Sequence, residues 1–128
     1  MQRIMMPWST LHAFRSGEAN ARFIPRTAWM SAADVKFLRW VFEAMAMQTD
    51  FRMKFAYQTA DSETATEAWV VLGSAQSADG FNRGSRTDVG SATTNKQLIR
   101  FGYITWNNVN DNTLVCAAAG GYVEVFSC

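Results

Sequence analysis

Two tryptophans and four polar residues are the side chains of this sequence whose chemistry suits sugar binding. A carbohydrate site needs an exposed aromatic ring for the apolar face of the sugar and fixed polar groups for its hydroxyls. The candidates are Trp69, Trp106, Asn82, Arg83, Asn108 and Asp111. Tryptophans also fill hydrophobic cores, so a structural interpretation of the pair stays open. If the protein binds a ligand, we predict that these six residues bind it.

The run from residue 107 to 112 presents side-chain oxygens of the kind that bind calcium. An EF-hand loop also needs a glycine and a later glutamate, and this run has neither. Asparagine and aspartate are equally typical of tight turns, where their side chains hydrogen-bond to nearby backbone. The turn is the favoured interpretation, and we predict no metal site and no cofactor.

Groups that would catalyse a reaction are sparse. The single histidine, His12, lies in an irregular N-terminal segment, and nothing in the sequence places it beside a nucleophile such as Cys116. The acids Asp79, Asp88 and Asp111 have no spacing that brings two of them together. Phosphate-loop, dinucleotide-binding and zinc-protease motifs are missing. We predict no catalytic residues, and a small enzyme is the least favoured class.

Strand-like alternation indicates which elements position the candidate residues. Residues 96–106 are rich in aromatic and β-branched side chains and lead into the Asn-rich run, which is typical of a strand followed by a turn. Residues 51–59 alternate in the same way, and residues 67–72 form a further predicted strand. Residues 113–126 are expected to form a hairpin across Gly120-Gly121. Such a series of strands favours an antiparallel sandwich or barrel, and we predict a mainly β, jelly-roll-like sandwich.

Two segments allow different interpretations. Residues 35–47 carry both a helical stripe of apolar residues and a two-residue alternation. A strand is favoured because residues 48–50 suit a tight hairpin link to the next strand, and the alternative is an α+β fold with one helix at about 35–47. Residues 74–95 are mostly polar and are expected to be a long loop, with a short edge strand near 86–89.

The N-terminal residues have a different character from the rest of the chain. Residues 1–30 lack a clean period and hold the only two prolines, Pro7 and Pro25. We predict an irregular N-terminal arm over residues 1–30, with a short strand near 21–24, and a single β-sandwich domain over residues 31–128. The aromatic residues of the arm are expected to pack on the domain or on a neighbouring copy.

Three segments resemble jelly-roll sandwiches of the carbohydrate-binding or galactose-binding-like kind. They are Trp69-Val70-Val71-Leu72-Gly73, Asp79-Gly80-Phe81-Asn82 and Ile99-Arg100-Phe101-Gly102-Tyr103. The resemblance covers about residues 33–126 and lies in layout, so no site residue is carried over from it. It implies a β-sandwich with a binding role. The arginine-rich N-terminal arm and the lack of an expected secretion signal depart from such modules.

Composition limits the classes of partner. The 128 residues are 48% hydrophobic and 13% aromatic, which favours a folded domain with a core. The formal net charge of +1 gives no electrostatic argument for nucleic acid or an anionic membrane, and we predict neither as a partner. No apolar run is long enough to cross a bilayer. The spacing of Cys116 and Cys128 leaves the compartment open, and we predict the cytoplasm.

Taken together, these patterns favour binding or assembly over catalysis. We predict a non-enzymatic β-sandwich that acts in self-assembly, as a structural or interaction subunit. A near-zero net charge leaves little repulsion between copies, and the arm offers a segment that can pack on a neighbour's sheet edge. A homo-oligomer is therefore expected. The alternative is a module that binds a carbohydrate or another small ligand.

Overall fold

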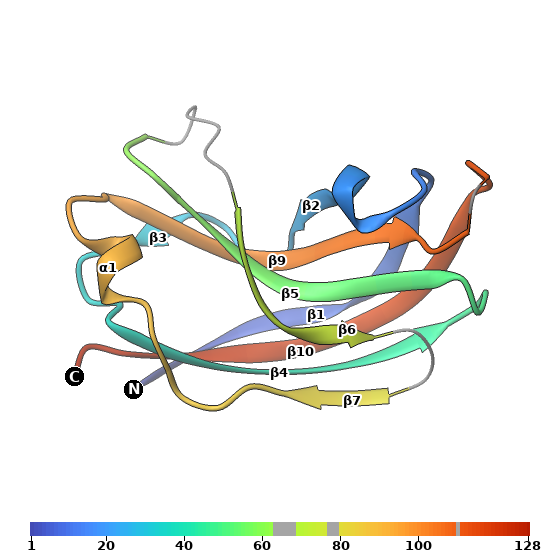
Figure 1. The fold of residues 1–128 in the computed structure, drawn as a ribbon. Helices are drawn as coiled ribbons and strands as arrows, with labels where there is room; N and C mark the ends of the chain where they lie inside the picture. The colour runs from blue at the N-terminus through green and yellow to red at the C-terminus, as the bar shows by residue number, and fades with distance from the viewer. Residues whose placement is uncertain (63–68, 77–79, 110) are drawn as a thin grey trace.

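The computed structural model describes residues 1–62, 69–76, 80–109 and 111–128, with the backbone alone at 74–76. The chain forms two antiparallel sheets that face each other across a hydrophobic core (Figure 1). The first sheet has the strand order β1 (Gln2–Ala13), β10 (Val115–Phe126), β4 (Phe37–Ala46) and β7 (Gly80–Arg83), and β8 (Thr87–Asp88) also pairs with β4. The second sheet has the order β2 (Arg22–Pro25), β9 (Leu98–Asn107), β5 (Phe51–Ala60) and β6 (Trp69–Gln76), and β3 (Met30–Ser31) also pairs with β9.

The path of the chain between the sheets is that of a jelly roll. The strands β1, β4, β7 and β10 lie in the first sheet, and β2, β5, β6 and β9 lie in the second. The chain therefore crosses repeatedly from one sheet to the other, and its first and last long strands pair with each other. Among the described residues, two helical elements interrupt the strands, the 3₁₀ turn η1 (Glu18–Asn20) and the short helix α1 (Gly90–Thr93). The predicted mainly β, jelly-roll-like sandwich is confirmed.

The ambiguous segment 35–47 contains strand β4, so the helical alternative is wrong. Its inward side chains Leu38, Trp40 and Phe42 are at most 2% exposed, whereas Arg39 and Glu43 point outward. Packing of one face against the core selects the two-residue period over the helical stripe. The expected hairpin to the next strand is also wrong, because residues 47–50 carry the chain across to the second sheet.

Residues 113–126 do not form a hairpin. They form one strand, β10, which pairs with β1 on one side and with β4 on the other. Both glycines instead allow close approach. A Cβ built at Gly121 would lie 2.0 Å from the carbonyl oxygen of Val41, and one at Gly120 would lie 2.8 Å from the indole of Trp8. Gly120 and Gly121 therefore allow neighbouring residues to pack closely against the strand, and they do not form the turn that the sequence predicted.

The polar stretch 74–95 contains more regular structure than expected. Strand β6 continues past Gly73 to Gln76, and Gly73 has a φ of 84° where the pairing with β5 shifts register. Strands β7 and β8 and helix α1 follow, and β8 corresponds to the short edge strand predicted near 86–89. The expectation of one long loop is wrong, because pairing with β4 orders these polar residues.

The N-terminal segment is also more regular than expected. Residues 2–13 form β1, which pairs with β10 along nearly its whole length, with a bulge between Met6 and Ser9. Met6 and Leu11 are each 1% exposed and belong to the core. The irregular conformation expected there is wrong, whereas the short strand expected near 21–24 is present as β2. The division of the chain into an arm and a domain at residue 30 stays a prediction.

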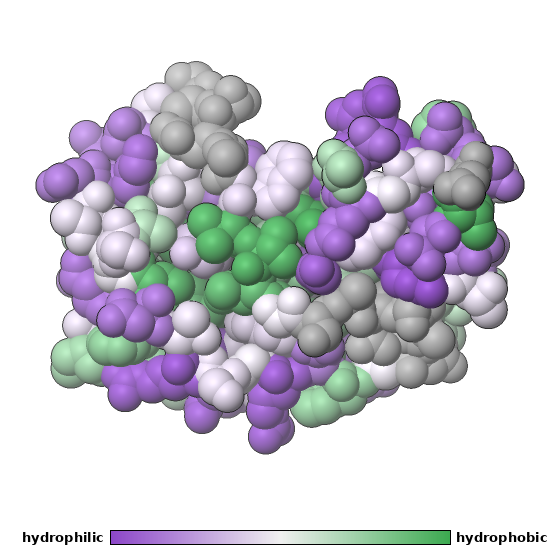
Figure 2. Space-filling model, in the orientation of Figure 1, coloured by the Kyte–Doolittle hydropathy of each residue, from purple (hydrophilic) through white to green (hydrophobic). Residues whose placement is uncertain are grey.

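The core between the sheets is aromatic. Phe42, Phe55, Phe101 and Tyr103 are each at most 1% exposed, and the Phe42 and Tyr103 rings meet edge to face with 5.2 Å between centroids. Trp40 closes the side of the sandwich between the edge strands β6 and β7, where its indole stacks on Phe55 at 5.3 Å. Figure 2 shows hydrophobic side chains gathered in the hollowed middle of this side. No helix among the described residues has the length and apolar character needed to cross a membrane.

Candidate functional site

The six predicted binding residues lie in four separate places. Trp106 belongs to the outer face of the second sheet but is 4% exposed, because it packs with Ala21, Ala56 and Ile104. The ammonium group of Lys54 lies 5.9 Å from the centre of its ring. The indole of Trp106 is therefore covered by the protein's own residues.

Asn82 and Arg83 lie on β7, at the side of the sandwich shown in Figure 2. They line a cavity of about 490 Å³ together with Trp40, Leu72, Gly73, Phe81, Gly84, Ser85 and Thr87. The guanidinium of Arg83 lies 5.5 Å from the ring centre of Phe81. These two predicted residues share one cavity, and the other four lie elsewhere. Asp79, at the start of the same predicted loop, lies outside the described residues.

Asn108 and Asp111 lie in the loop after β9, which is fastened by hydrogen bonds of the kind expected for a turn. The side chain of Asn107 donates to the carbonyl oxygen of Thr113 at 2.8 Å and accepts from the amide of Val109 at 3.0 Å. The Asp111 carboxylate accepts from the amide of Thr113 at 3.2 Å. The side-chain oxygens of Asn107 and Asp111 thus accept hydrogen bonds from backbone amides, as in the turn that the sequence favours. Asn110 lies outside the described residues.

Trp69 is the predicted residue whose ring is accessible beside a cleft. It starts β6, is 39% exposed, and lies nearly parallel to Phe23 of β2 with 6.4 Å between ring centroids. The cavity beside it has a volume of about 510 Å³ and is lined by Arg15, Asn20, Ala21, Arg22, Phe23, Gln58, Trp69 and Arg100. An aromatic ring and several polar side chains therefore face the same space.

A second cavity of about 360 Å³ adjoins the first. The two share the lining residues Arg15, Asn20, Arg22 and Phe23. The second cavity adds apolar side chains, Phe14 and Leu114, which are 55% and 57% exposed. We call the two cavities together the arginine cleft. The lining of the cleft includes Trp69 of β6 as well as Phe14 and Leu114, which lie next to β1 and β10.

The outer face of the first sheet is different, because it carries several exposed hydrophobic side chains, together with charged ones such as Glu43. The exposed hydrophobic residues come from β1, from β4 and its end, and from β7, and they are Met5, Trp8, Met45, Met47 and Phe81. In the strand register, Met5 is opposite Tyr122, which is opposite Val41, and the outward Glu43 lies between Gly120 and Phe81. The Trp8 indole packs against Gly120, where a side chain would displace it. We call this surface the methionine face.

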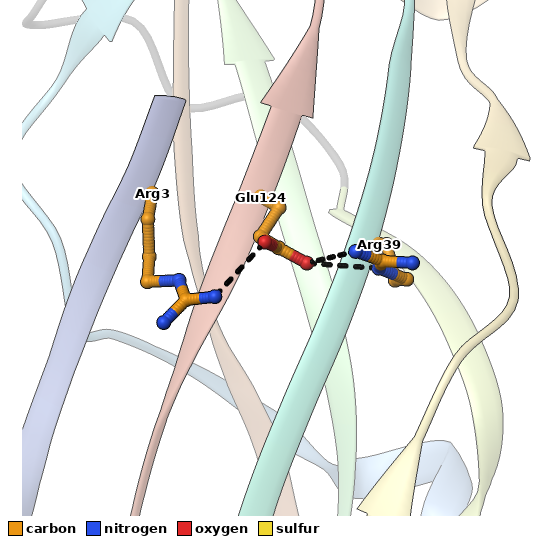
Figure 3. Close-up of polar contacts among 3 residues, drawn as sticks. All are labelled: Arg3, Arg39 and Glu124. Carbon is orange, nitrogen blue, oxygen red and sulfur yellow. Dashed lines mark hydrogen bonds and ion pairs between the residues drawn. The ribbon is translucent and has the colours of Figure 1, made fainter. Parts of the chain in front are cut away.

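One charged row crosses the methionine face near its end. Glu124 of β10 is 3% exposed and lies between Arg3 of β1 and Arg39 of β4 (Figure 3). Its carboxylate is 2.6 Å from Arg39 and 3.1 Å from Arg3. Hydrogen bonds from Arg39 first, and then from Arg3, lower the pKa of this carboxyl group. The carboxylate of Glu124 therefore stays ionised and paired with the two arginines, and these ion pairs link β1, β10 and β4.

Sequence reasoning missed both the arginine cleft and the methionine face as sites. The cleft joins residues 15–22 to Gln58, Trp69 and Arg100, and no local pattern relates these segments. The methionine face had a partial signal, because Met45 and Met47 alternate with inward residues of the predicted strand. The partner positions Met5 and Trp8 became visible only through the pairing of β1 with β10.

The sequence matches no protein-family model and no curated protein. Among solved structures it is similar to chains of infectious bursal disease virus. The structure of the Gt strain matches with a TM-score of 0.66 at 8% identity, over 95% of this chain and 31% of that chain. The VP2 subviral particle of this virus matches with a TM-score of 0.63 at 9% identity, over 98% of this chain and 32% of that one.

These similarities establish the fold and nothing beyond it, because the identities are so low. The chain spans less than a third of the length of the viral chains that it resembles. The neighbours are viral β-sandwiches, so the jelly-roll layout expected from the sequence is supported. The more specific likeness to carbohydrate-binding modules stays a prediction.

Proposed function

We propose that this protein is a structural subunit that self-assembles, and that copies meet through the methionine face. The observation that carries the proposal is the exposed apolar surface of the first sheet, where Met5, Trp8 and Met45 are 60%, 53% and 54% exposed. Large exposed apolar side chains gathered on one face mark interaction sites in soluble proteins. Methionines suit such surfaces because their flexible side chains adapt to a partner.

A second copy of this chain is the partner that the remaining observations favour. The fold resembles that of a viral protein whose solved structure is a subviral particle. The formal net charge of +1 leaves little long-range repulsion between identical subunits. The carboxylate of Glu124 is paired with Arg3 and Arg39 of the same face, so it does not enter an interface as an unpaired charge.

Solution mass tests the proposal. We expect light scattering to show a mass that rises with concentration for the unchanged protein, and a subunit mass for a variant that combines Met5→Lys with Met45→Lys. Both positions are exposed, so the lysines have access to water in the separate subunit and strongly oppose contact in an assembly. Leu114→Lys is the matched control, because Leu114 is a 57% exposed apolar residue in the arginine cleft.

Two results would contradict assembly through this face. One is a subunit mass for the unchanged protein at every concentration tested. The other is an oligomer that survives the double substitution but is lost in the control. Deleting residues 1–30 is a weaker test, because it removes the buried side chains of Met6 and Leu11 and so damages the core. A cytoplasmic location stays a prediction from the sequence.

The arginine cleft favours a second candidate function, which is sugar binding. Its support is the accessible ring of Trp69 beside the polar side chains of Asn20 and Gln58 in one cavity. We expect simple methyl glycosides to shift the NMR signals of residues around Trp69, and Trp69→Ala to abolish these shifts. Phe81→Ala is the control, because Phe81 is an exposed aromatic residue of the other sheet. Shifts that persist without Trp69 would refute this function.

A further inference from the structure

We propose that the arginine cleft binds an acidic sugar, with its carboxylate held between Arg15 and Arg22 and its ring against Trp69. This inference rests on the sugar-binding function proposed above and adds the charge of the ligand.

Arg15 and Arg22 are cationic side chains without an internal partner. Both are exposed, and both line each of the two cavities that make up the cleft. Neither guanidinium forms a hydrogen bond, an ion pair or a ring contact with the part of the chain that the structure describes. A guanidinium offers a planar set of donors that matches a carboxylate, so two beside one cavity form a receptor for an anion.

The surroundings of the cleft do not neutralise this charge. No aspartate or glutamate is among the described residues that line either cavity. The described acid nearest in sequence, Glu18 of η1, is paired with Lys54 at 2.6 Å. The cavity wall therefore has a net positive charge from its described residues, although the whole chain carries only +1.

A third arginine, Arg100, has a different role in the same cavity. Its Nε donates to Oε1 of Gln58 at 2.9 Å, and its guanidinium lies 4.2 Å from the ring centre of Trp29. Its burial against these groups lowers the pKa of Arg100. Arg100 is thus a positioning residue, which fixes the Gln58 amide in the cavity wall and adds positive charge beneath the ligand.

The apolar walls favour a ring over a bare anion. Trp69 and Phe23 form a stacked pair with an interplanar angle of 14°, and both residues line the cavity beside the arginines. Asn20 donates through Nδ2 to the carbonyl oxygen of Ser16 at 2.8 Å, and its Oδ1 accepts no hydrogen bond from the described residues. A sugar acid supplies an apolar ring face, hydroxyl groups and a carboxylate, and so uses all three features.

The test compares two sugars that differ in one group, methyl β-glucuronide and methyl β-glucoside. In NMR titrations of the full chain at low salt, we expect the glucuronide to bind roughly tenfold more tightly, which corresponds to about 1.4 kcal/mol. Arg15→Gln and Arg22→Gln should each remove most of this preference and leave the glucoside unaffected. Arg83→Gln is the matched control, because Arg83 is an arginine in the cavity of the other sheet edge.

The outcomes separate this inference from the function on which it rests. Equal binding of the two sugars, lost in Trp69→Ala, would keep the sugar function and overturn the acidic ligand. No binding of either sugar would overturn both. Inorganic phosphate is the third probe, and binding of phosphate as tight as that of the glucuronide would show that the cleft selects the anion alone, which also overturns the proposal. Unchanged amide spectra of the free variants confirm that each one is folded.

Discussion

The two outer faces of this sandwich are built from similar long strands, but they differ in how far their outward apolar side chains are exposed. Each face has outward side chains at every second residue of long antiparallel strands. On the second sheet, Ala21 and Phe23 pack with the outward side chains, so Ile104 and Trp106 are only 2% and 4% exposed. On the first sheet no segment of the described residues packs in this way on Met45, which remains 54% exposed.

The role of an apolar residue on the outer face of a sheet therefore depends on whether another segment of the chain packs on it. Ile104 packs against Ala21 of the same chain, so its burial contributes to folding. Met45 remains exposed and is accessible to another molecule. The same part of the chain lines the arginine cleft, since Arg15 and Arg22 lie on either side of η1 and line both cavities. One sheet therefore offers a flat surface suited to a partner, and the other offers a concave surface suited to a small ligand.

Substitution of an outward apolar residue by lysine should give the largest difference in the free energy of unfolding between the two faces. Ile104→Lys places a charge among Ala21, Ala56 and Trp106, and we expect a loss of at least about 3 kcal/mol in the free energy of unfolding. Met45→Lys should change that free energy by less than about 0.5 kcal/mol, because the lysine reaches water. Urea denaturation of the two variants measures both values. Similar losses in both would contradict the contrast between a covered and a bare face.

An intermediate effect is expected from the charged row on the methionine face, and it depends on pH. The arginines lower the pKa of Glu124 below its value of about 4.3 in the unfolded chain. The ionised carboxylate therefore stabilises the fold fully above that pH, and this contribution is lost as the pH falls through the lowered pKa of the folded state.

Glu124→Gln should remove this contribution. Melting curves should show the variant less stable than the unchanged protein at pH 7, and the difference should shrink below about pH 4 as the native carboxylate is protonated. Asp88→Asn provides a control on the same sheet, because Asp88 makes no ion pair with the described residues. A difference that stays constant from pH 7 to pH 3 would show that Glu124 acts through its shape and not through its charge.

The smallest effect is expected inside the core, between the two faces. The hydroxyl of Tyr103 is buried without a hydrogen-bond partner among the described residues, and burial raises its pKa, opposed in part by the charge of Arg26. Tyr103→Phe keeps the ring and removes the unpaired hydroxyl, so we expect stability to be unchanged or raised by up to about 1 kcal/mol. Thermal melting measures it, and a clear loss of stability would reveal a partner for this hydroxyl.

The sequence predicted those parts of the fold that depend on local alternation. Phe51, Met53, Phe55 and Tyr57 are all buried as their spacing indicated, because a sheet with one face on the core enforces a period of two. Gly120-Gly121 misled because glycines serve both turns and close strand contacts, and only the neighbouring Trp8 and Val41 distinguish the two uses.

The candidate sites were less predictable than the fold. Trp69 and Trp106 have similar local sequence contexts, yet one is accessible and the other is covered by Ala21. The cover comes from a segment more than forty residues away in the chain, so no local signal distinguishes the two tryptophans. The same holds for Arg15 and Arg22, whose importance depends on their shared cavity with Trp69.

The central claim is that the methionine face is buried when copies assemble. Labelled methionine methyl groups measure this directly, because Met5, Met45 and Met47 lie on the face while Met6 and Met53 lie in the core. A soluble paramagnetic probe should broaden the first three signals in dilute protein and spare them at concentrations where light scattering shows assembly. If the mass rises while Met5, Met45 and Met47 remain as accessible as in dilute protein, then assembly uses another surface and the account is wrong.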